Sequence, residues 1–335
     1  MLMVRPVEFT DITALEQLAQ LAGASMTTLP LERNHLNDLI AATQEALHQT
    51  IHQPASEIYH FVLVDTVSEE VLGIAGIDST VGIQTPFYSY RMEDIIHASN
   101  DLQIHNRIPA LKLCHDHTGY SRLCTFYIRP DVDTNLSLQL LSRARLLFIA
   151  EHRDRFAARI LVELQGIVDE DGKSPFWEDL GHQFFTMDMA QASYLTGICD
   201  KSLIADLMPK HPIYTLLLSK KARSVIGEVR PDRMPAQDLL EQEGFSYEGY
   251  VDIFDAGPSL EACIDRLYTV SQSTLGCLND TFATSDHYLI ANTSCTHFRC
   301  MALTRDKTLY TAKSQIADMM RLDKNNTIRM INLFP

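Results

Sequence analysis

The feature that most constrains the fold is a strand, helix and strand pattern in the middle of the chain. A β-rich run from Leu123 to Ile128 stops at Arg129-Pro130, because proline cannot continue a central strand. A long helical pattern from Leu136 to Phe156 follows, and Ile160 to Ile167 then reads as another strand. This succession predicts an α+β fold with a mixed central sheet flanked by helices.

The central helical segment is amphipathic, and one face collects its apolar residues, namely Leu140, Leu141, Ala144, Leu147, Phe148 and Ala150. Its charged residues Arg143, Arg145, Glu151 and Arg153 are mostly placed off that face. We therefore expect them to lie away from the core. Asp133 or Thr134 is suited to cap the start of this helix.

The N-terminal part of the chain predicts two helices and a hairpin. Thr10 to Gly23 has apolar residues at helical spacing and a glycine suited to end the helix. A second helix is expected from about Leu36 to Gln49. Tyr59 to Asp65 and Val71 to Ile77 alternate like two antiparallel strands around a polar turn.

After about Leu275 the chain changes to short β-prone segments, including Tyr288 to Ala291, Leu309 to Ala312 and Thr327 to Leu333. We therefore expect a small, mainly β C-terminal lobe. A length of 335 residues also exceeds the usual size of one domain. The predicted division is 1–200, 201–270 and 271–335.

The net charge and the pattern of the N-terminus indicate which partners and which compartment to expect. The formal net charge of -15 opposes binding to nucleic acid or to an anionic membrane. The N-terminus lacks the pattern of a signal peptide, and no apolar run approaches a membrane span. These features predict a cytoplasmic protein.

The cysteine pattern predicts neither disulfides nor a metal site. Seven cysteines without CxxC spacing fit a reducing compartment. Cys295, His297 and Cys300 lie in one β-prone stretch and lack the spaced pairs of a structural zinc site. No metal is therefore expected.

Several motifs follow one another in order along the chain. They are His97-Ala-Ser99, Asp116-His-Thr-Gly119, Ser174-Pro-Phe-Trp177, Leu180-Gly181, Met208-Pro-Lys-His-Pro-Ile-Tyr214, Ile226-Gly227, Glu243-Gly-Phe245 and Val251-Asp-Ile-Phe-Asp-Ala-Gly-Pro258. Together they resemble the motifs of the arginine N-succinyltransferase family, within the acetyltransferase superfamily often called GNAT. The resemblance spans roughly the first 270 residues and fades in the tail. It implies transfer of a succinyl group from succinyl-CoA to the α-amino group of arginine, in bacterial arginine catabolism.

The same resemblance implies a GNAT-like acyl-CoA-binding domain over 1–200, a substrate-side segment over 201–270 and assembly as a homo- or hetero-oligomer. It assigns succinyl-CoA binding to the position of Phe126, in a strand whose backbone, at Thr125 and Ile128 as well, would contact the pantetheine arm and thioester. A buried strand phenylalanine is also common in an ordinary core. The role of Phe126 therefore depends on its position rather than on its residue type.

Three positions depart from the family pattern. The connection after the strand has no glycine, although glycine lets backbone N–H groups approach phosphates closely. Arg230 stands where the family has a proton-donating histidine, and a guanidinium cannot donate a proton at neutral pH. Gln165 stands where the family tends to have arginine. Arg230 is a candidate to hold the succinyl carboxylate in its place.

The remaining candidate residues are chosen by their chemistry. His211 is the candidate catalytic histidine, because the unperturbed imidazole of histidine suits proton transfer near neutral pH, although a histidine between prolines is more often structural. Glu163, Asp252 and Asp255 are candidates to pair with the guanidinium of arginine, and Asp255 can equally end a strand. His117 is expected to shape a loop, with a second possible role in lining the substrate pocket.

Two other functions stay open at this point. A non-catalytic arginine- or acyl-CoA-binding paralogue, or a partner subunit, would keep the fold without the glycines and the histidine. An acyltransferase with a different amine or acyl donor would explain Gln165 and Arg230. Binding of succinyl-CoA and release of its thiol distinguish these alternatives.

Overall fold

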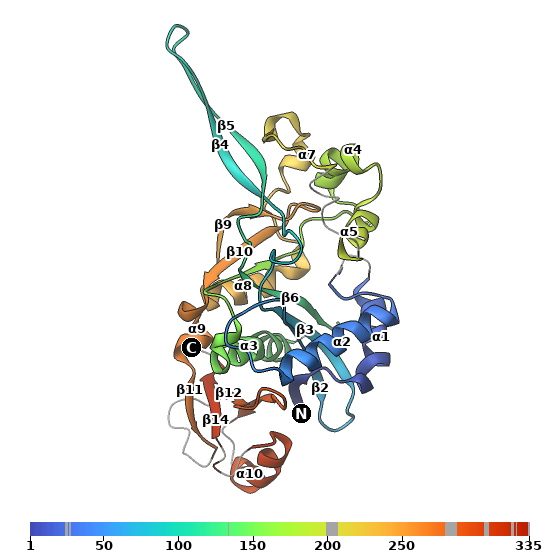
Figure 1. Cartoon of the computed structure of the whole chain (residues 1–335), viewed down its shortest axis with the longest axis vertical. Coiled ribbons are helices and arrows are strands. Elements are labelled where there is room, and N and C mark those ends of the chain that lie inside the picture. Colours follow the sequence, from blue (N-terminus) through green and yellow to red (C-terminus); the bar gives the residue numbers. More distant parts are fainter. Residues whose placement is uncertain are drawn as a thin grey trace. The chain divides into compact units, whose positions relative to one another are not determined.

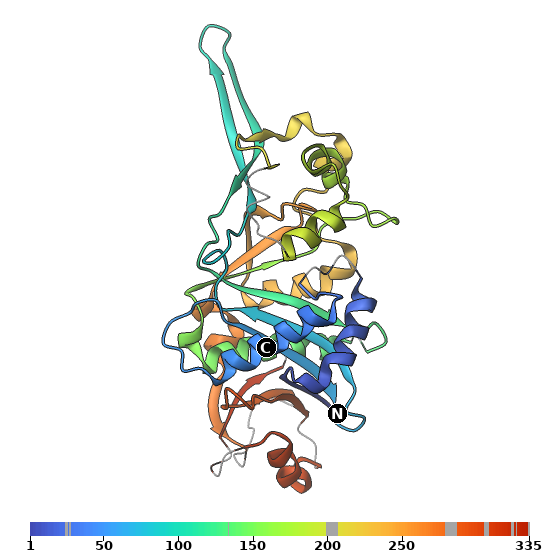
Figure 2. The same cartoon turned by 45° about the vertical axis from the view of Figure 1, so that its right-hand side comes forward.

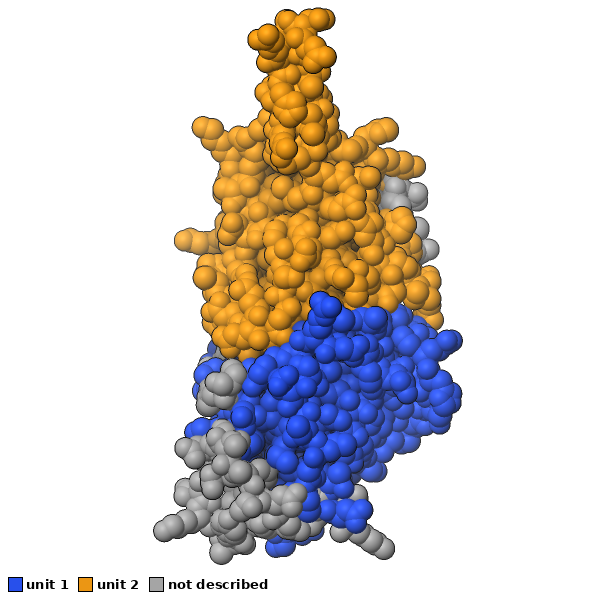
Figure 3. Space-filling model, turned by 90° about the vertical axis from the view of Figure 1, so that its left-hand side faces the viewer, with its two compact units in different colours: residues 1–80, 121–158, 263–335 blue, residues 81–120, 159–262 orange. Residues whose placement is uncertain are grey.

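A computed structural model describes residues 1–23, 26, 28–132, 134–198, 207–278, 287–304, 308–322, 325 and 327–333. The chain forms two compact units that interleave along the sequence (Figure 3). Unit 1 comprises residues 1–80, 121–158 and 263–335, and unit 2 comprises residues 81–120 and 159–262. The predicted division into 1–200, 201–270 and 271–335 stays a prediction. Each of the two units combines stretches that are separate in the sequence, whereas the three predicted segments are continuous.

Unit 1 is built on an antiparallel sheet with the strand order β11-β14-β12-β13-β1-β2-β3-β6 (Figure 1). Its strands are β1 (Leu2–Pro6), β2 (Ile58–Asp65), β3 (Val71–Asp78), β6 (Ser121–Ile128), β11 (Thr274–Cys277), β12 (His287–Asn292), β13 (Cys300–Thr304) and β14 (Thr327–Asn332). The predicted hairpin is confirmed, since β2 and β3 pair antiparallel. The strand at Leu123 to Ile128 is confirmed as most of β6.

The helices of unit 1 are α1 (Ile12–Ala22), α2 (Arg33–His48), α3 (Asn135–Glu151), α9 (Tyr268–Gln272) and α10 (Thr308–Met319), with short 3-10 turns η1 (Phe9–Asp11), η2 (Arg153–Arg155) and η6 (Ile264–Arg266). Helix α1 buries Leu15, Leu18 and Ala19 and ends at Gly23, whose φ is 75°. Both predicted N-terminal helices are therefore confirmed. The helices and strands of the chain belong to the α+β class, as the sequence pattern predicts.

The expected exposure of the basic residues on α3 is wrong for two of them. Arg143 and Arg145 are buried, with 0% and 3% of their surface exposed. The helix packs against strands β1, β2 and β3 and also against β12, β13 and α9, so most of its surface is covered. An amphipathic pattern cannot reveal this coverage, because β12, β13 and α9 lie more than 100 residues away from α3 in the sequence.

The C-terminal part of unit 1 is mainly β, as expected, but the strand predicted at Leu309 to Ala312 is wrong. These residues lie in α10. Ile316 and Met320 are buried one helical turn apart in the cluster beneath β12 and β13. A short apolar run does not by itself distinguish a strand from a helix. No helix in the described ranges is long and apolar enough to cross a membrane.

Unit 2 has the strand order β7-β10-β9-β4-β5-β8. Its strands are β4 (Ser89–Ser99), β5 (Ile104–Cys114), β7 (Arg159–Glu163), β8 (Ile213–Tyr214), β9 (Ser246–Val251) and β10 (Pro258–Cys263). Its helices are α4 (His182–Phe185), α5 (Met189–Ile198), α7 (Lys220–Arg223) and α8 (Met234–Glu243), with short turns η3 (Trp177–Gly181), η4 (Thr215–Leu217) and η5 (Pro231–Arg233). Phe176, Trp177 and Tyr90 are fully buried at the centre of its core.

Candidate acyl-transfer site

Strand β6 contains an irregularity at the residues assigned to succinyl-CoA. Ile74 of β3 pairs with Tyr127 and Gly76 with Cys124, so a single residue of β3 faces both Thr125 and Phe126. Thr125 adopts a φ of 51°, a conformation that is uncommon for a β-branched residue. This is a β-bulge, which leaves the extra residue unpaired in the ladder and redirects the strand.

A buried polar chain supports the bulge from one side. Thr125 Oγ1 donates to the carbonyl of Thr28 at 3.2 Å and lies 3.3 Å from His60 Nε2. His60 Nδ1 lies 3.4 Å from the hydroxyl of Thr43 on α2. Burial lowers the pKa of His60 to about 4, so the ring is neutral at physiological pH. The bulged residue is thus held by a neutral imidazole.

Arg145 contacts the bulge from helix α3. Its Nη1 makes long hydrogen bonds to the carbonyls of Gly76 and Cys124, at 3.4 and 3.5 Å. Its guanidinium carbon lies 4.9 Å from the centre of the Phe126 ring, within the range of a cation–π interaction. Burial lowers the pKa of Arg145 to about 10. The side chain therefore remains a buried cation at neutral pH.

The three predicted cofactor-binding residues differ in exposure. Thr125 and Ile128 are buried, whereas Phe126 is partly exposed. Two of the three side chains are therefore committed to packing. Any contact of this strand with an acyl-CoA would have to use mainly the backbone, in line with the expectation that position matters more than residue type.

The start of α3 follows the expected capping. Thr134 accepts from the backbone N–H of Ser137 at 3.2 Å, and Ser137 Oγ accepts from the N–H of Thr134 at 2.7 Å. Asp133 lies outside the described residues. Arg129 donates to both oxygens of Asp131, at 2.9 and 2.5 Å, and pairs with Glu70. Its positive charge is thus offset by two carboxylates.

In unit 2, the predicted guanidinium-binding carboxylates come together. Glu163 ends β7, and Asp252 and Asp255 lie between β9 and β10. Burial, followed by the charge of Asp252, raises the pKa of Asp255 to about 7, and Glu163 adds to the effect. Asp252 accepts from the backbone N–H of Asp255, and Asp255 accepts from the N–H of Gly166, three residues after Glu163. We call these three carboxylates the Asp255 cluster.

Backbone hydrogen bonds fix this cluster. Asp255 accepts from the N–H of Gly166 at 2.7 Å and from that of Gly257 at 2.8 Å. Asp252 accepts from the N–H groups of Phe254 and Asp255, at 2.7 and 3.1 Å. A Cβ on Gly257 would lie 2.1 Å from the Leu164 carbonyl oxygen, so only glycine fits.

Arg230 lies next to the same segment. Its N–H donates to the carbonyl of Gln165 at 2.9 Å, and its guanidinium binds both oxygens of Asp232, at 2.6 and 2.9 Å. Arg233 Nε donates to the side chain of Gln165 at 3.0 Å. Glu163, Arg230 and Asp252, the three predicted substrate-binding residues, thus lie on neighbouring backbone segments, whereas the guanidinium of Arg230 is bound to Asp232. Arg233 was not predicted.

His211 lies apart from these contacts. It is exposed and lies two residues before β8. Within the part of the chain that the structure describes, no hydrogen bond or ion pair joins it to the Asp255 cluster. Its catalytic role stays a prediction.

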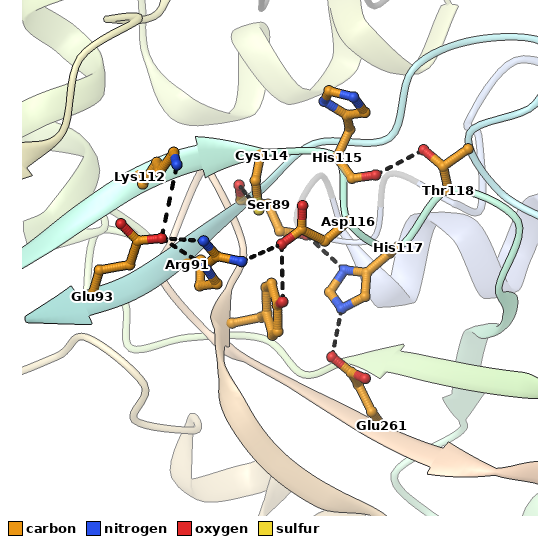
Figure 4. Close-up of polar contacts among 11 residues, drawn as sticks. Ser89, Arg91, Glu93, Lys112, Cys114, His115, Asp116, His117, Thr118 and Glu261 are labelled. Atoms are coloured by element: carbon orange, nitrogen blue, oxygen red, sulfur yellow. Dashed lines mark hydrogen bonds and ion pairs between the residues drawn. The ribbon is translucent and has the colours of Figure 1, made fainter.

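A second polar cluster in unit 2 surrounds His117 (Figure 4). Its Nδ1 lies 3.1 Å from Ser89 Oγ and its Nε2 lies 2.8 Å from Glu261. Burial opposes ionisation of Glu261, but hydrogen bonds from His117 and Arg159 hold its pKa below the usual value. The order Ser, His, Glu is that of a nucleophilic triad. However, Ser89 is only 1% exposed, so the group joins β4 to β10 rather than attacking a substrate.

Two residues that support the bulge, His60 and Arg145, were missed by sequence reasoning. Neither lies in a motif, and their common signal is burial, which depends on contacts that are distant in sequence. No group of three or more His, Cys, Asp or Glu side chains among the described residues is arranged to hold a metal ion.

Comparisons with known proteins agree over the whole chain. Residues 2–269 match the family model described as arginine N-succinyltransferase beta subunit. Proteins named arginine N-succinyltransferase from Enterobacter sp. strain 638 and Citrobacter koseri are each 40% identical, covering 100% and 99% of this chain and 98% of each relative. The solved structure of arginine/ornithine succinyltransferase subunit AI from Pseudomonas aeruginosa matches with a TM-score of 0.89 and 33% identity, over 100% of this chain and 99% of that one. The likeness therefore continues through the C-terminal tail.

Proposed function

The chain belongs to the arginine N-succinyltransferase family, and we propose that it transfers the succinyl group of succinyl-CoA to the α-amino nitrogen of arginine. In this reaction the amine nitrogen attacks the thioester carbonyl carbon. A C–N bond forms, the C–S bond breaks, the amine loses a proton and the thiolate of CoA gains one. The protein must therefore bind two substrates, stabilise a developing oxyanion and allow proton transfer.

The observation that supports binding of the succinyl-CoA thioester is the bulge at Thr125 and Phe126 in β6. A bulge frees backbone donors within an otherwise paired strand, and such donors can polarise a thioester carbonyl. The buried cation of Arg145, hydrogen-bonded behind the bulge, adds a positive field of the sign that favours an oxyanion.

The Asp255 cluster supports the amine side. Carboxylates pair with a guanidinium in a planar, bidentate geometry that selects arginine over shorter amines. Glu163 and Asp252 are partly buried at this cluster, where such pairs are screened less than at the surface. We assign them to the arginine guanidinium, with Asp255 holding the loop by its two backbone hydrogen bonds.

For proton transfer, the family resemblance implies a histidine at the position of Arg230. The guanidinium of Arg230 is bound to Asp232 and is no acid at neutral pH. We keep His211 as the candidate proton-transfer group and water as the alternative carrier. We also place the enzyme in the cytoplasm. We expect it to form an oligomer, since the family model describes a beta subunit and the solved structure a subunit AI.

The experiment is calorimetry with succinyl-CoA combined with an assay of thiol release in the presence of arginine or ornithine. We expect binding, and release that depends on the amine. Thr125→Pro should abolish release because proline fixes φ near −65° and cannot adopt the bulge, whereas the control Thr125→Gly can adopt it. Folded protein that neither binds nor releases thiol would leave the non-catalytic alternative.

A further inference from the structure

A group of basic side chains lies where the C-terminal strands of unit 1 meet its first strand. Strand β13 pairs antiparallel with β1, with Val4 opposite Cys300. One step further in this register, Arg5 comes opposite Arg299. Figures 1 and 2 show β12, β14 and α10, in red, beside the N-terminus of the chain. Like charges opposite each other on neighbouring strands are destabilising, so sheet pairing alone does not favour two arginines here.

The two arginines differ in their partners. Arg5 donates to both oxygens of Asp11, at 2.7 Å each, so its charge is neutralised. Arg299 is only 5% exposed, and its guanidinium donates to the carbonyl of Phe298 at 3.2 Å. Among the residues that the structure describes, Arg299 forms no ion pair. Burial of an unpaired charge is costly, and Arg299 is therefore an unusual feature of this sheet.

A third arginine belongs to the same group. Arg321 follows α10 and is exposed, and its Nη1 lies 3.1 Å from Nδ1 of His297. A guanidinium can only donate, so the imidazole nitrogen accepts this hydrogen bond and holds Arg321 without neutralising it. Arg321 also has a φ of 49°, which is uncommon for a residue other than glycine. Backbone conformations of this kind cluster at functional sites.

The charges of this group do not cancel. Burial, followed by the charges of Arg321 and Arg5, lowers the pKa of Arg299 to about 10, while Glu8 and Asp11 act in the opposite direction. Asp11 is already bound to Arg5. Within the described ranges, Arg299 and Arg321 thus remain cations without a salt bridge, in a chain whose formal net charge is -15.

One buried asparagine holds the group in place. Asn292 ends β12 and is 2% exposed. Its Oδ1 accepts from the N–H of Arg299 at 3.1 Å, and its Nδ2 donates to the carbonyls of His297 and Met320, at 2.7 and 2.8 Å. Met320 directly precedes Arg321. The turn between β12 and β13 is therefore fixed to the end of α10 before any ligand arrives, which lowers the cost of binding one.

We propose that Arg299 and Arg321 form a binding site for a phosphate group. Two guanidinium groups without salt bridges match the double negative charge of a phosphate, and each can donate two parallel hydrogen bonds to its oxygens. A carboxylate would balance only one of the two charges. Arg321 is exposed and Arg299 is buried, so the ligand reaches the site from the solvent at Arg321 and supplies the anionic partner that Arg299 lacks.

This site is separate from the acyl region of β6. Strands β1, β2 and β3 lie between β13 and β6 in the sheet, and four spacings of ~4.8 Å give a separation of ~19 Å. A phosphate group can arrive as free phosphate or as part of a larger ligand, including the acyl-CoA of the proposed function. The recognised chemistry is the same in both cases.

The first test is calorimetric titration of the full chain with inorganic phosphate at constant ionic strength. We expect one saturable phosphate per chain. Arg321→Gln, at an exposed position, should weaken binding at least about tenfold, because a charge-assisted partner is lost. The control Arg329→Met removes an arginine of β14 that already pairs with Glu151 at 2.8 Å, and it should bind phosphate as the wild type does. No saturable binding by the wild type, or equal binding by Arg321→Gln, would overturn the proposal.

Arg299→Met tests the buried part of the site by thermal unfolding. Without phosphate its Tm should not fall below that of the wild type, because the variant loses an unpaired charge, whereas loss of one partner of a buried ion pair is strongly destabilising. Saturating phosphate should raise the Tm of the wild type by about 2 to 5 °C and leave that of Arg299→Met unchanged. A lower Tm of the variant without phosphate, or an equal response to phosphate, would contradict the site.

Titration with succinyl-CoA distinguishes the two sources of the phosphate group. If the group belongs to the acyl-CoA, Arg321→Gln weakens the binding of succinyl-CoA as well as that of inorganic phosphate. If it belongs to free phosphate or to another phosphorylated compound, only the binding of inorganic phosphate is weakened. Both results support the site. Neither depends on turnover, so failure of the proposed acyl transfer would leave this test intact.

Discussion

The acyl region of unit 1 and the Asp255 cluster of unit 2 both bury ionisable groups, but of opposite kinds. Behind the bulge of β6 lie His60 and Arg145, bases whose pKa values burial lowers to about 4 and about 10. In unit 2 burial and neighbouring carboxylates raise the pKa of Asp255 to about 7. A developing oxyanion is favoured beside a cation, and a guanidinium beside carboxylates. The two regions thus carry the opposite charges that the proposed acyl and amine roles require, and they should respond to pH and to substitution in opposite ways.

The largest expected effect is the pH dependence due to His60. Its pKa is about 4 in the folded state, against an ordinary value of 6.5 for histidine. Below pH 6.5 the unfolded chain therefore binds more protons, so the stabilising contribution is complete above pH 6.5 and is lost as the pH falls through 4. The loss is ~3 kcal/mol of unfolding free energy.

Urea unfolding followed by circular dichroism between pH 7.5 and 4 would measure this loss. His60→Gln should remove it, and the exposed control His105→Gln should not. His152, whose pKa burial also lowers to about 4, titrates in the same direction, so the difference between wild type and variant is the quantity to compare. Equal slopes for wild type and His60→Gln would contradict the prediction.

Asp255 should behave in the opposite way. Its folded pKa is raised above the unfolded value of 3.8, so its stabilising contribution is present below pH 3.8 and is lost as the pH rises through about 7. Asp255→Asn should flatten the decline on this alkaline side. Fluorescence of Trp177, the only tryptophan and buried in unit 2, reports this unit directly. A wild type whose unit 2 gains stability from pH 5 to 8 would contradict the assignment.

Glu163→Gln tests the amine side. Loss of one charged partner of a guanidinium costs about 1.5 to 3 kcal/mol, so the KM for arginine should rise by up to about 100-fold. The KM for succinyl-CoA should not change. Glu170→Gln, at an exposed turn two residues beyond Val168, is the matched control. An unchanged KM for arginine would remove Glu163 from the site.

Arg145→Met tests the acyl side. Without the guanidinium the carbonyls of Gly76 and Cys124 lose a donor and the bulge loses its positive field. We expect kcat to fall about tenfold with the KM for arginine unchanged. Arg145→Lys should restore part of the rate. Arg143→Met is the matched control, since Arg143 is equally buried on α3 but donates to the carbonyl of Leu333. A similar loss in both variants would indicate a general effect on folding.

The contrast between the two regions also explains what the sequence could predict. The Asp255 cluster was predictable, because carboxylates suit a guanidinium and Glu163, Asp252 and Asp255 could be chosen by chemistry alone. The bulge was not predictable, because Leu123 to Ile128 reads as an ordinary strand. Arg145 was misplaced because its guanidinium lies against the bulge of β6 and the Gly76 carbonyl of β3, and an amphipathic pattern does not show these contacts. Residue type thus predicts sites that are formed by side chains. A site formed by the backbone becomes visible only when the pairing of the strands is known.

The same contrast gives the smallest expected effect, at Arg230. Its guanidinium already pairs with Asp232, which is 56% exposed, and a pair of this kind contributes about 0.2 to 1 kcal/mol. Arg230→Ala should therefore raise the KM for succinyl-CoA no more than about fivefold, by removing a weak contact with the succinyl carboxylate. Asp232→Asn should lower it, because the guanidinium is then released to bind that carboxylate. Initial rates at varied succinyl-CoA measure both. Changes of opposite sign in the KM for succinyl-CoA would support the hypothesis that Arg230 takes over the role of the arginine that the resemblance implies at position 165. An unchanged KM in Arg230→Ala would exclude it.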